Sequence, residues 1–438
     1  MLSRLRLPPL PPQAQQARVV IVGAGAAGLV AAHLLQNAGV QVEVIEANAQ
    51  PGGRVRRSAS GWEQGACHLR GITNLLAREA IERGVVQQVL GLRPMVILDG
   101  RLHDLTAPGL DADIAALMAQ IARIPSYRGG AQPLSAWLAR RELPPRVQPL
   151  AGRLAELVGG TAETVCIAEL ARLYPALPFL YGPAGDHADH DVTEPFVSLL
   201  DGLVLPLRGV LHTGAAVTAI HHGGRGPLRV DTATGRSWTA DKVLVTVPLP
   251  ILKQRRIQFF PALPWAKLQA IDRLQVVPGL KGRLTFSAAF WPSPFRLIGA
   301  ETVARCWTER SAPALQFEAL GHQAEALACL RPEEAAHRVL AELDPLFDGE
   351  PSKRFVEAEL LDWTAEPWIG GAYTLPAAGW TADKARLAQP IHGRLFFAGD
   401  ATNTGAPFEH TPHTVQGALA TGLRAATEIA TALRHPER

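Results

Sequence analysis

Apolar runs, interrupted by glycine, proline and polar residues, alternate along this chain at strand and helix spacing. Four consecutive apolar residues at 19–22 predict a short buried strand, and the apolar positions of 29–37 predict a helix that stops before Gly39. The apolar run at 40–45 predicts a second strand. A strand, a helix and a strand in this order predict a βαβ unit with two parallel strands.

Glycines occupy the turn between the first strand and the helix, at Gly23, Gly25 and Gly28, with the spacing G-x-G-x-x-G. Gly23 allows a tight turn, Gly25 lets the backbone approach a pyrophosphate, and Gly28, next to Ala27, lets the helix pack on the strand. Glu46 follows the second strand, where its carboxylate can accept hydrogen bonds from both ribose hydroxyls and repel a 2′-phosphate. The segment therefore predicts a site for a non-phosphorylated adenine dinucleotide.

Further strands and helices are expected along the rest of the chain, with helices near 111–123, 134–141 and 150–157, a hairpin of 228–231 with 238–240, strands at 241–247 and 393–400, and a long helix over 414–433. These elements indicate two interleaved domains. Residues 1–17 are expected to be a flexible N-terminal tail. The nucleotide-binding domain comprises 18–86, 201–268 and 386–438, and the substrate-binding domain comprises 87–200 and 269–385.

Composition narrows the class of protein. The chain has 438 residues, of which 47% are hydrophobic and 19% charged, enough for two domains with their own cores. Its net charge of +3 is too small to favour nucleic acid as a partner, and no apolar run is long enough to span a bilayer. The four cysteines show no metal or redox spacing, and the His-rich stretch 186–191 fits no regular metal site. We expect a cytoplasmic protein with reduced thiols and no metal.

A second glycine pair follows the second strand in Pro51-Gly-Gly-Arg-Val55, where Gly53 and Arg54 can contact a pyrophosphate. Together with Glu46, this segment resembles the flavoprotein family of monoamine oxidases, polyamine oxidases, L-amino-acid oxidases and phytoene-desaturase-like enzymes. The resemblance implies that the dinucleotide is FAD. It also implies an α/β fold in which an FAD-binding Rossmann-like domain is interleaved with an α+β substrate-binding domain.

Lys281 is the residue that the resemblance marks as catalytic. It lies in a strand-like run that ends in Phe290-Trp291, and flavin amine oxidases have a lysine followed by Phe-Trp at the same offset. In that family the lysine holds a water against flavin N5, the atom that accepts hydride. The alternative from the residues alone is a surface lysine on an edge strand.

The segment Gly65-Ala-Cys-His-Leu-Arg-Gly71 resembles the part of polyamine oxidases that runs under the flavin near the substrate entrance. The match implies that Gly65 and Ala66 contact the cofactor. His68 replaces an aromatic residue of the family, and Arg70 stands where a polar or acidic residue reads a cationic chain. A guanidinium repels polyamines and attracts a carboxylate, so we expect His68 and Arg70 to contact the substrate. Pairing of Arg70 with a neighbouring acid or a phosphate remains an equal alternative.

The segment from Trp363 to Tyr373 resembles the family's Trp…Gly-Gly-x-Tyr element. The resemblance places Trp363 at the cofactor and makes Tyr373 one aromatic wall of the amine site. Mitochondrial relatives carry a cysteine before this tyrosine that bonds the flavin, and Ala372 stands there in this chain. FAD is therefore expected to be non-covalent.

Four further positions match the family's cofactor contacts, namely Val217 at the adenine, Gly399 and Asp400 at the ribityl–phosphate part, and Val415 in the first turn of the last helix, which is expected to point at flavin O2. The family's second aromatic wall precedes that helix, where this chain has His413 and Thr414. We expect these two residues to contact the substrate. The second aromatic wall is therefore either missing or supplied by Phe408, His410, His413 or Trp380.

The resemblance implies an FAD-dependent amine oxidase that transfers hydride from the amine α-carbon to flavin N5, hydrolyses the imine and is reoxidised by O2 with formation of H2O2. The expected partners are a small-molecule amine and O2, with neither nucleic acid nor membrane, and the sequence allows a homodimer. Alternatives are an L-amino-acid oxidase in which Arg70 binds the carboxylate, a desaturase or dehydrogenase that does not use O2, and a flavoprotein that keeps FAD as a structural core.

Overall fold

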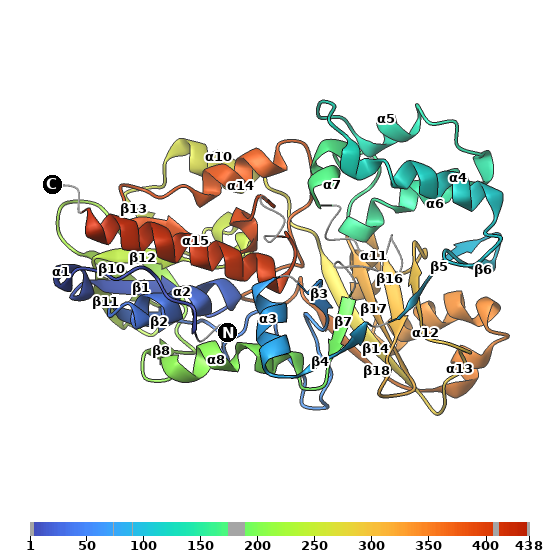
Figure 1. The fold of residues 1–438 in the computed structure, drawn as a ribbon, viewed down its shortest axis with the longest axis horizontal. Helices are drawn as coiled ribbons and strands as arrows, with labels where there is room; N and C mark the ends of the chain where they lie inside the picture. The colour runs from blue at the N-terminus through green and yellow to red at the C-terminus, as the bar shows by residue number, and fades with distance from the viewer. Residues whose placement is uncertain (1–3, 73, 90, 174–188, 406–410, 436–438) are drawn as a thin grey trace. The chain divides into compact units, whose positions relative to one another are not determined.

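The computed structural model describes residues 4–72, 74–89, 91–173, 189–405 and 411–435. The chain forms two compact units, each assembled from separate segments (Figure 1). The first unit comprises Met1–Val86, Val192–Leu274 and Thr381–Arg438, and the second comprises Gln87–Asp191 and Gln275–Trp380. The chain passes from one unit to the other after residues 191, 274 and 380, whereas the predicted boundaries follow residues 200, 268 and 385. Residues 192–200 illustrate the reason, because Phe196, Leu199 and Leu200 join the core of the first unit and sequence alone does not assign a linker to a core.

The first unit is built on a parallel sheet with the strand order β19-β12-β1-β2-β8. Its strands are β1 (Arg18–Val22), β2 (Gln41–Ile45), β8 (Leu211–His212), β12 (Lys242–Val245) and β19 (Leu395–Phe397). The predicted strands at 19–22 and 40–45 correspond to β1 and β2, which pair from Arg18 with Gln41 to Val22 with Ile45. Because β1 is central, four of its five residues are buried.

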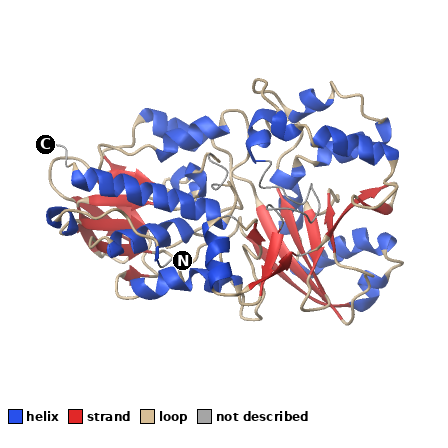
Figure 2. Cartoon of the chain, in the orientation of Figure 1, coloured by secondary structure: helices blue, strands red, loops and turns tan. Residues whose placement is uncertain are grey.

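Two helices pack against each other in this unit, α2 (Ala26–Asn37) and α15 (Val415–Arg434). A Cβ on Gly422 of α15 would lie 2.2 Å from the carbonyl oxygen of Ala27, so the helices touch through backbone at this point. Figure 2 shows both helices lying alongside the strands of the unit. The alanine- and leucine-rich surface of α2 is buried throughout its first ten residues, which explains why this helix lacks a polar face.

A second sheet in the first unit has the order β11-β10-β9-β13. Its strands are β9 (Val217–His221), β10 (Leu228–Thr232), β11 (Ser237–Ala240) and β13 (Gln258–Phe260). β10 and β11 are antiparallel, with Leu228 opposite Ala240, which confirms the predicted hairpin. The remaining elements of the unit are α1 (Pro12–Gln15), β3 (Leu69–Arg70), α3 (Leu75–Glu82), η7 (Phe196–Leu200), α8 (Asp201–Val204), η8 (Leu205–Leu207), α9 (Leu249–Lys253), α10 (Trp265–Arg273), α14 (Trp380–Ala388) and η10 (Asp400–Thr402).

The prediction of a free N-terminal tail is wrong for the described part of that segment. Leu7, Leu10 and Ala14 are buried in the core of the first unit, with exposed fractions of 8%, 5% and 5%. The prolines that break the apolar pattern of this segment also fix an extended backbone, which can lie along a surface without forming a long helix. Arg434 of α15 donates to the carbonyl of Pro8 at 2.6 Å and holds the segment further.

The second unit is built on a seven-stranded sheet with the order β18-β14-β17-β16-β15-β5-β6. Its strands are β5 (Arg93–Leu98), β6 (Arg101–Asp104), β14 (Gly279–Phe286), β15 (Phe295–Ile298), β16 (Arg305–Thr308), β17 (Ala314–Leu320) and β18 (Phe355–Asp362). Adjacent strands are antiparallel except β15 and β5. One face carries Leu284, Phe286, Phe317 and Leu297, which form a hydrophobic core with α11 (His322–Ala328) and α12 (Pro332–Leu343).

Helices of the second unit include α4 (Ala112–Ile121), α5 (Leu134–Leu138), α6 (Gln148–Arg153), α7 (Ile167–Leu173) and α13 (Glu350–Arg354), with the short elements η2 (Ile124–Ser126), η3 (Pro145–Val147), η4 (Glu156–Val158) and η9 (Asp344–Leu346). The predicted helix 150–157 is broken, because α6 ends at Arg153 and a 3₁₀ turn follows. Strands β4 (Val86–Val89) and β7 (Asp189–Val192) lie where the chain passes from one unit to the other. Within the described ranges, no helix is long and apolar enough to cross a membrane.

Candidate functional site

The two glycine loops of the first unit lie against each other. Gly25 forms a bridge with Gly52, and a Cβ on Gly53 would lie 3.5 Å from the Cα of Gly25. A Cβ on Gly28 would come within 2.0 Å of the carbonyl oxygen of Gly23, so this glycine is required for packing. A Cβ on Gly25 would meet no described atom within 4 Å. The backbone of Gly25 therefore borders open space at the N-terminus of α2, and the loops fit a pyrophosphate.

Glu46 lies at the end of β2, 6% exposed, with its carboxylate fixed by backbone groups. One oxygen accepts from the N–H of Ala24 at 2.7 Å, and the other accepts from the N–H of Asn48 at 2.8 Å. Each carboxylate oxygen can accept more than one hydrogen bond, so ribose hydroxyls remain possible donors. The bonds hold the carboxylate beside the glycine loop, as a ribose site requires.

Backbone hydrogen bonds bring two other predicted segments to Glu46 and to the second glycine loop. The N–H of Ala215 donates to the carbonyl of Glu46 at 2.9 Å, which places the start of β9, with buried Val217, next to the acid. The N–H of Ala66 donates to the carbonyl of Arg54 at 3.2 Å, so the 65–66 segment adjoins the second glycine loop. Gly399 follows β19, and a Cβ there would lie 3.4 Å from the carbonyl oxygen of Thr246.

Three positively charged groups of the first unit act on the carboxylate of Asp400. Burial raises the pKa of its carboxyl, but the charges of Lys384, His413 and Arg54 lower it more, and the pKa falls to about 2. The N–H of His413 donates to Asp400 at 3.1 Å, and His413 has a left-handed backbone with φ 62°. Lys384 is 0% exposed and was not among the residues predicted from sequence. The only signal for it in the sequence is that lysine is rare in this chain.

The N-terminus of α15 lies beside the predicted substrate segment 65–71. The hydroxyl of Thr414 caps the helix by accepting from the N–H of Gly417 at 3.1 Å, and Val415 begins the first turn. The side chain of Gln416 donates to the carbonyl of Arg70 at 3.2 Å. Thr414 thus has a structural role as the helix cap, and its contact with the substrate stays a prediction. Near Arg70, the Sγ of Cys67 lies 3.6 Å from the Nδ1 of His68.

Lys281 belongs to the second unit and is 2% exposed in β14. β14 lies between β17 and β18, so the edge-strand alternative is wrong. Its Nζ lies 5.5 Å from the centroid of the Trp307 ring. Lys281 pairs with Glu318 on β17, and Glu318 pairs with Arg305 on β16. Directly opposed residues share one face of a sheet, so these three charged side chains form a row.

The backbones of Trp363 and Tyr373 form hydrogen bonds with residues at or just before the beginning of β14. The N–H of Trp363 donates to the carbonyl of Gly279 at 2.9 Å, and the N–H of Val277 donates to the carbonyl of Tyr373 at 2.8 Å. The Tyr373 hydroxyl donates to Glu318 Oε2 at 3.3 Å and accepts from Arg305 at 3.4 Å. The structure thus brings Tyr373 to the charged row that contains Lys281.

Arg305 and Glu318 form an ion pair that sequence reasoning missed. Nε of Arg305 donates to Glu318 Oε2 at 2.8 Å, and Nη2 also donates to that oxygen. Burial lowers the pKa of Arg305, but Glu318 and Tyr373 raise it, and the net effect is a raised pKa that keeps the guanidinium charged. The alternating polar positions of β17, Gln316 and Glu318, are a weak signal for this face of the sheet. Their partners could be found only from the strand register.

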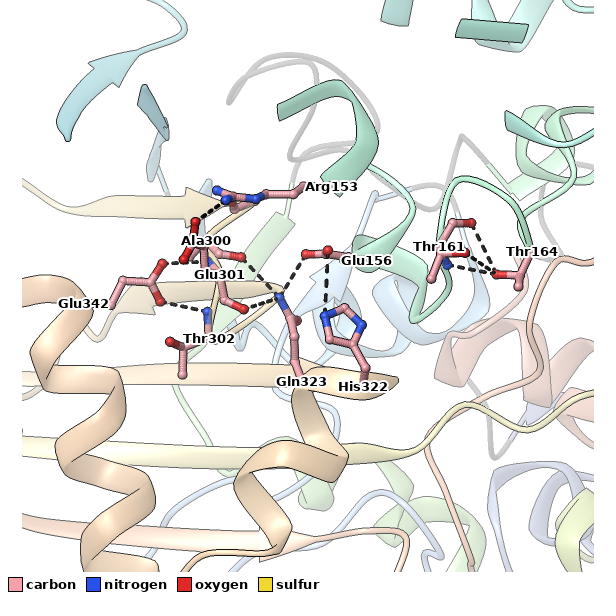
Figure 3. A network of polar contacts seen from close by, with 11 residues as sticks. Arg153, Glu156, Thr161, Thr164, Ala300, Glu301, Thr302, His322, Gln323 and Glu342 are labelled. Carbon is pink, nitrogen blue, oxygen red and sulfur yellow. Dashed lines mark hydrogen bonds and ion pairs between the residues drawn. The ribbon is translucent and has the colours of Figure 1, made fainter. Parts of the chain in front are cut away.

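A second polar network anchors the end of β17, as Figure 3 shows. The amide of Gln323 donates to Glu156 at 3.0 Å and to the carbonyls of Ala300 and Glu301 at 3.1 Å. Burial raises the pKa of Glu156. Although several acids meet here, no group of described residues in the chain has metal-binding geometry. The network therefore fixes the turn after β17 relative to η4 and the strands.

The candidates for a second aromatic wall divide into described and undescribed residues. Trp380 is 2% exposed, and its indole N–H donates to the hydroxyl of Thr374 at 2.8 Å, as expected for a core residue. Phe408 and His410 lie outside the described residues. Trp380 belongs to the second unit, as do Lys281, Trp363 and Tyr373, whereas the other described site residues predicted from sequence belong to the first.

A parallel sheet with paired glycine loops and an acid at the end of the second strand is typical of dinucleotide-binding proteins. A model of the NAD(P)-binding Rossmann-like domain matches residues 21–79, and a model of the flavin containing amine oxidoreductase matches residues 189–430. The chain belongs to the family of flavin-containing amine oxidoreductases. This membership confirms the predicted family, the fold class and FAD as the cofactor, and it makes the chain an FAD-dependent oxidoreductase of the class that acts on amines.

Curated relatives include a lysine-specific histone demethylase 1 homolog 2 from Oryza sativa subsp. japonica, 30% identical over 456 residues, which covers 96% of this chain and 58% of the relative. Human lysine-specific histone demethylase 2 is 29% identical over 468 residues, covering 96% of this chain and 54% of the relative. The chain thus spans little more than half the length of these relatives.

Among solved structures, a wild-type putrescine oxidase bound to putrescine superposes with a TM-score of 0.78 at 20% identity, over 98% of this chain and all of that one. Cyclohexylamine oxidase from Brevibacterium oxydans IH-35A gives a TM-score of 0.76 at 20% identity, over 96% of this chain and 99% of that one. At this identity the likeness establishes the fold alone.

Proposed function

We propose that this protein is an FAD-dependent oxidase of small amines, with the first unit as its FAD-binding domain and the second as its substrate-binding domain. The observation that carries the proposal is the position of Lys281, which is only 2% exposed in a central strand and lies in register with other charged groups. A buried ammonium is costly unless it is paired or hydrogen-bonded, so Lys281 needs polar groups around it in this strand. Family membership and the fitting glycine loops support the same proposal.

The residues that would hold FAD are those of the two glycine loops, Glu46, Arg54 and Asp400. Bound FAD supplies the acceptor for a hydride from the amine α-carbon, and O2 would reoxidise it with formation of H2O2. Ala372 offers no thiol for a covalent link, which favours a dissociable cofactor. The helix dipole of α15 would place partial positive charge at Val415.

On the amine side, Lys281 Nζ would donate a hydrogen bond to a water and exchange a proton with it. Tyr373 would form one wall of the amine site and exclude bulk water from it. Its hydroxyl is held by Glu318 and Arg305, so the ring has a fixed orientation. Tyr373 would thus orient a neutral amine, and Lys281 would exchange protons through the water.

The proposal is tested by oxygen uptake. Purified holoprotein is given primary, secondary and poly-amines and amino acids, with O2 consumption and H2O2 formation measured together. An oxidase consumes O2 and forms H2O2 in equal amounts with at least one amine. A protein that oxidises amines only with an artificial electron acceptor is a dehydrogenase, and a protein that oxidises none of them contradicts the proposal.

A further inference from the structure

The face of the second unit's sheet that carries Lys281 is lined with paired charges. Lys281, Arg283, Arg296 and Arg305 provide its positive groups on β14, β15 and β16. Arg283 pairs with Glu309 at 2.9 Å, Arg296 pairs with Asp189 at 2.8 Å, and Arg305 pairs with Glu318. Among the described residues of this face, each of these three acids thus has a guanidinium partner.

The pair Arg305–Glu318 contacts the hydroxyl of Tyr373, the residue proposed as one wall of the amine site. Glu318 stands directly opposite Lys281 and also accepts from the Tyr373 hydroxyl. Its side chain is 19% exposed and that of Arg305 is 11% exposed, so solvent screens the pair little. A carboxylate at this position would attract a cationic group of a substrate, but the charge of Arg305 cancels it.

We propose that Arg305 is a specificity-determining residue, which neutralises Glu318 and thereby selects amines without a second positive charge over diamines. The inference rests on the proposed amine oxidation. A diamine that brings its second ammonium near Glu318 would meet an acid that is already paired with Arg305. It would pay for desolvation of that charge without gaining a carboxylate in return.

Three variants test the proposal through the ratio of kcat/KM for α,ω-diamines to that for n-alkylamines of equal length. Arg305→Gln removes the guanidinium from Glu318 and should raise this ratio on the order of tenfold. Glu318→Gln removes the carboxylate and keeps the guanidinium, so it should lower the ratio. The double variant, Arg305→Gln with Glu318→Gln, should return it to the wild-type value. Spectral binding titrations with each amine under anaerobic conditions should show the same order of affinities.

A matched control is Arg283→Gln, which removes the guanidinium that pairs with Glu309 and Glu359 on the same face and should leave the ratio within about twofold of wild type. Breaking a buried ion pair is destabilising, so thermal unfolding is recorded for every variant. If Arg305→Gln does not fold, Glu318→Gln and the double variant still test the role of Arg305. Both lack the carboxylate, and only Glu318→Gln keeps the guanidinium.

An unchanged ratio in Arg305→Gln, or an equal rise in Arg283→Gln, would overturn the inference. A loss confined to amino-acid substrates would also overturn it, because Arg305 would then bind a substrate carboxylate. These outcomes are distinct from failure of the proposed function, in which the wild-type protein oxidises neither monoamines nor diamines.

Discussion

The two units hold their candidate residues by different means. In the first unit the site is made mostly of backbone, with glycines that admit close approach and a carboxylate, Glu46, fixed by two N–H groups. In the second unit it is made of side chains, with Lys281, Glu318 and Arg305 aligned across three strands. A backbone site tolerates change in its surroundings but not in its glycines, whereas a charged row depends on every partner. The predictions below separate these two cases.

The largest effect is expected on the charged row. In Lys281→Met, amine-dependent reduction of the bound flavin should slow on the order of 100-fold, because the proposed proton exchange with water is lost. Flavin content and thermal stability should change little, since methionine fits the volume of a buried lysine stem. Anaerobic stopped-flow absorbance measures the rate. A variant that is reduced as fast as wild type would remove Lys281 from the reaction.

The backbone site is tested by a pair of glycine substitutions. Gly28→Ala places a Cβ 2.0 Å from the carbonyl oxygen of Gly23 and should cost the apoprotein about 3 kcal/mol in free energy of unfolding. Gly25→Ala meets no described atom within 4 Å, so apoprotein stability should stay within about 1 kcal/mol of wild type.

The same Gly25→Ala variant should bind FAD more weakly if a pyrophosphate approaches that backbone. Urea unfolding of the apoproteins and fluorescence titration with FAD separate the two effects. Equal FAD affinity in Gly25→Ala and wild type would place the pyrophosphate elsewhere.

A smaller effect, with a pH signature, is expected at Asp400. Lys384, His413 and Arg54 outweigh burial and lower its pKa from 3.8 to about 2. A carboxyl with a depressed folded-state pKa contributes stability above its unfolded pKa, and this contribution is lost as the pH falls through the folded-state pKa. The stability gap between wild type and Asp400→Asn should therefore be constant above about pH 4 and shrink by about 2 kcal/mol towards pH 2. Urea unfolding across this range gives the gap.

The smallest effect is expected at Arg70, whose backbone is held by Gln416 at the start of α15. In Arg70→Ala, KM for polyamines should fall and KM for amino acids should rise, each by about threefold, because a solvent-screened charge acts weakly. Steady-state kinetics with both substrate classes measures the change. Unchanged KM values across both classes would remove Arg70 from substrate binding.

The sequence predicted the backbone site far better than the charged row. Gly23, Gly25 and Glu46 are close together in the chain, and their chemistry follows from local spacing. Glu318 and Arg305 become neighbours of Lys281 only through strand register, which depends on the whole sheet. Lys384 reaches Asp400 through packing of α14, and Leu7 joins a core that no local pattern identifies.

The most direct test of the account is anaerobic titration of the purified yellow protein with a primary monoamine. The account predicts that the visible absorbance of the oxidised flavin disappears with one equivalent of amine for each bound FAD. Flavin that stays oxidised with every amine tried, but is bleached by dithionite, would contradict it. Such a protein would bind FAD in its first unit without using the charged row of its second unit to oxidise amines.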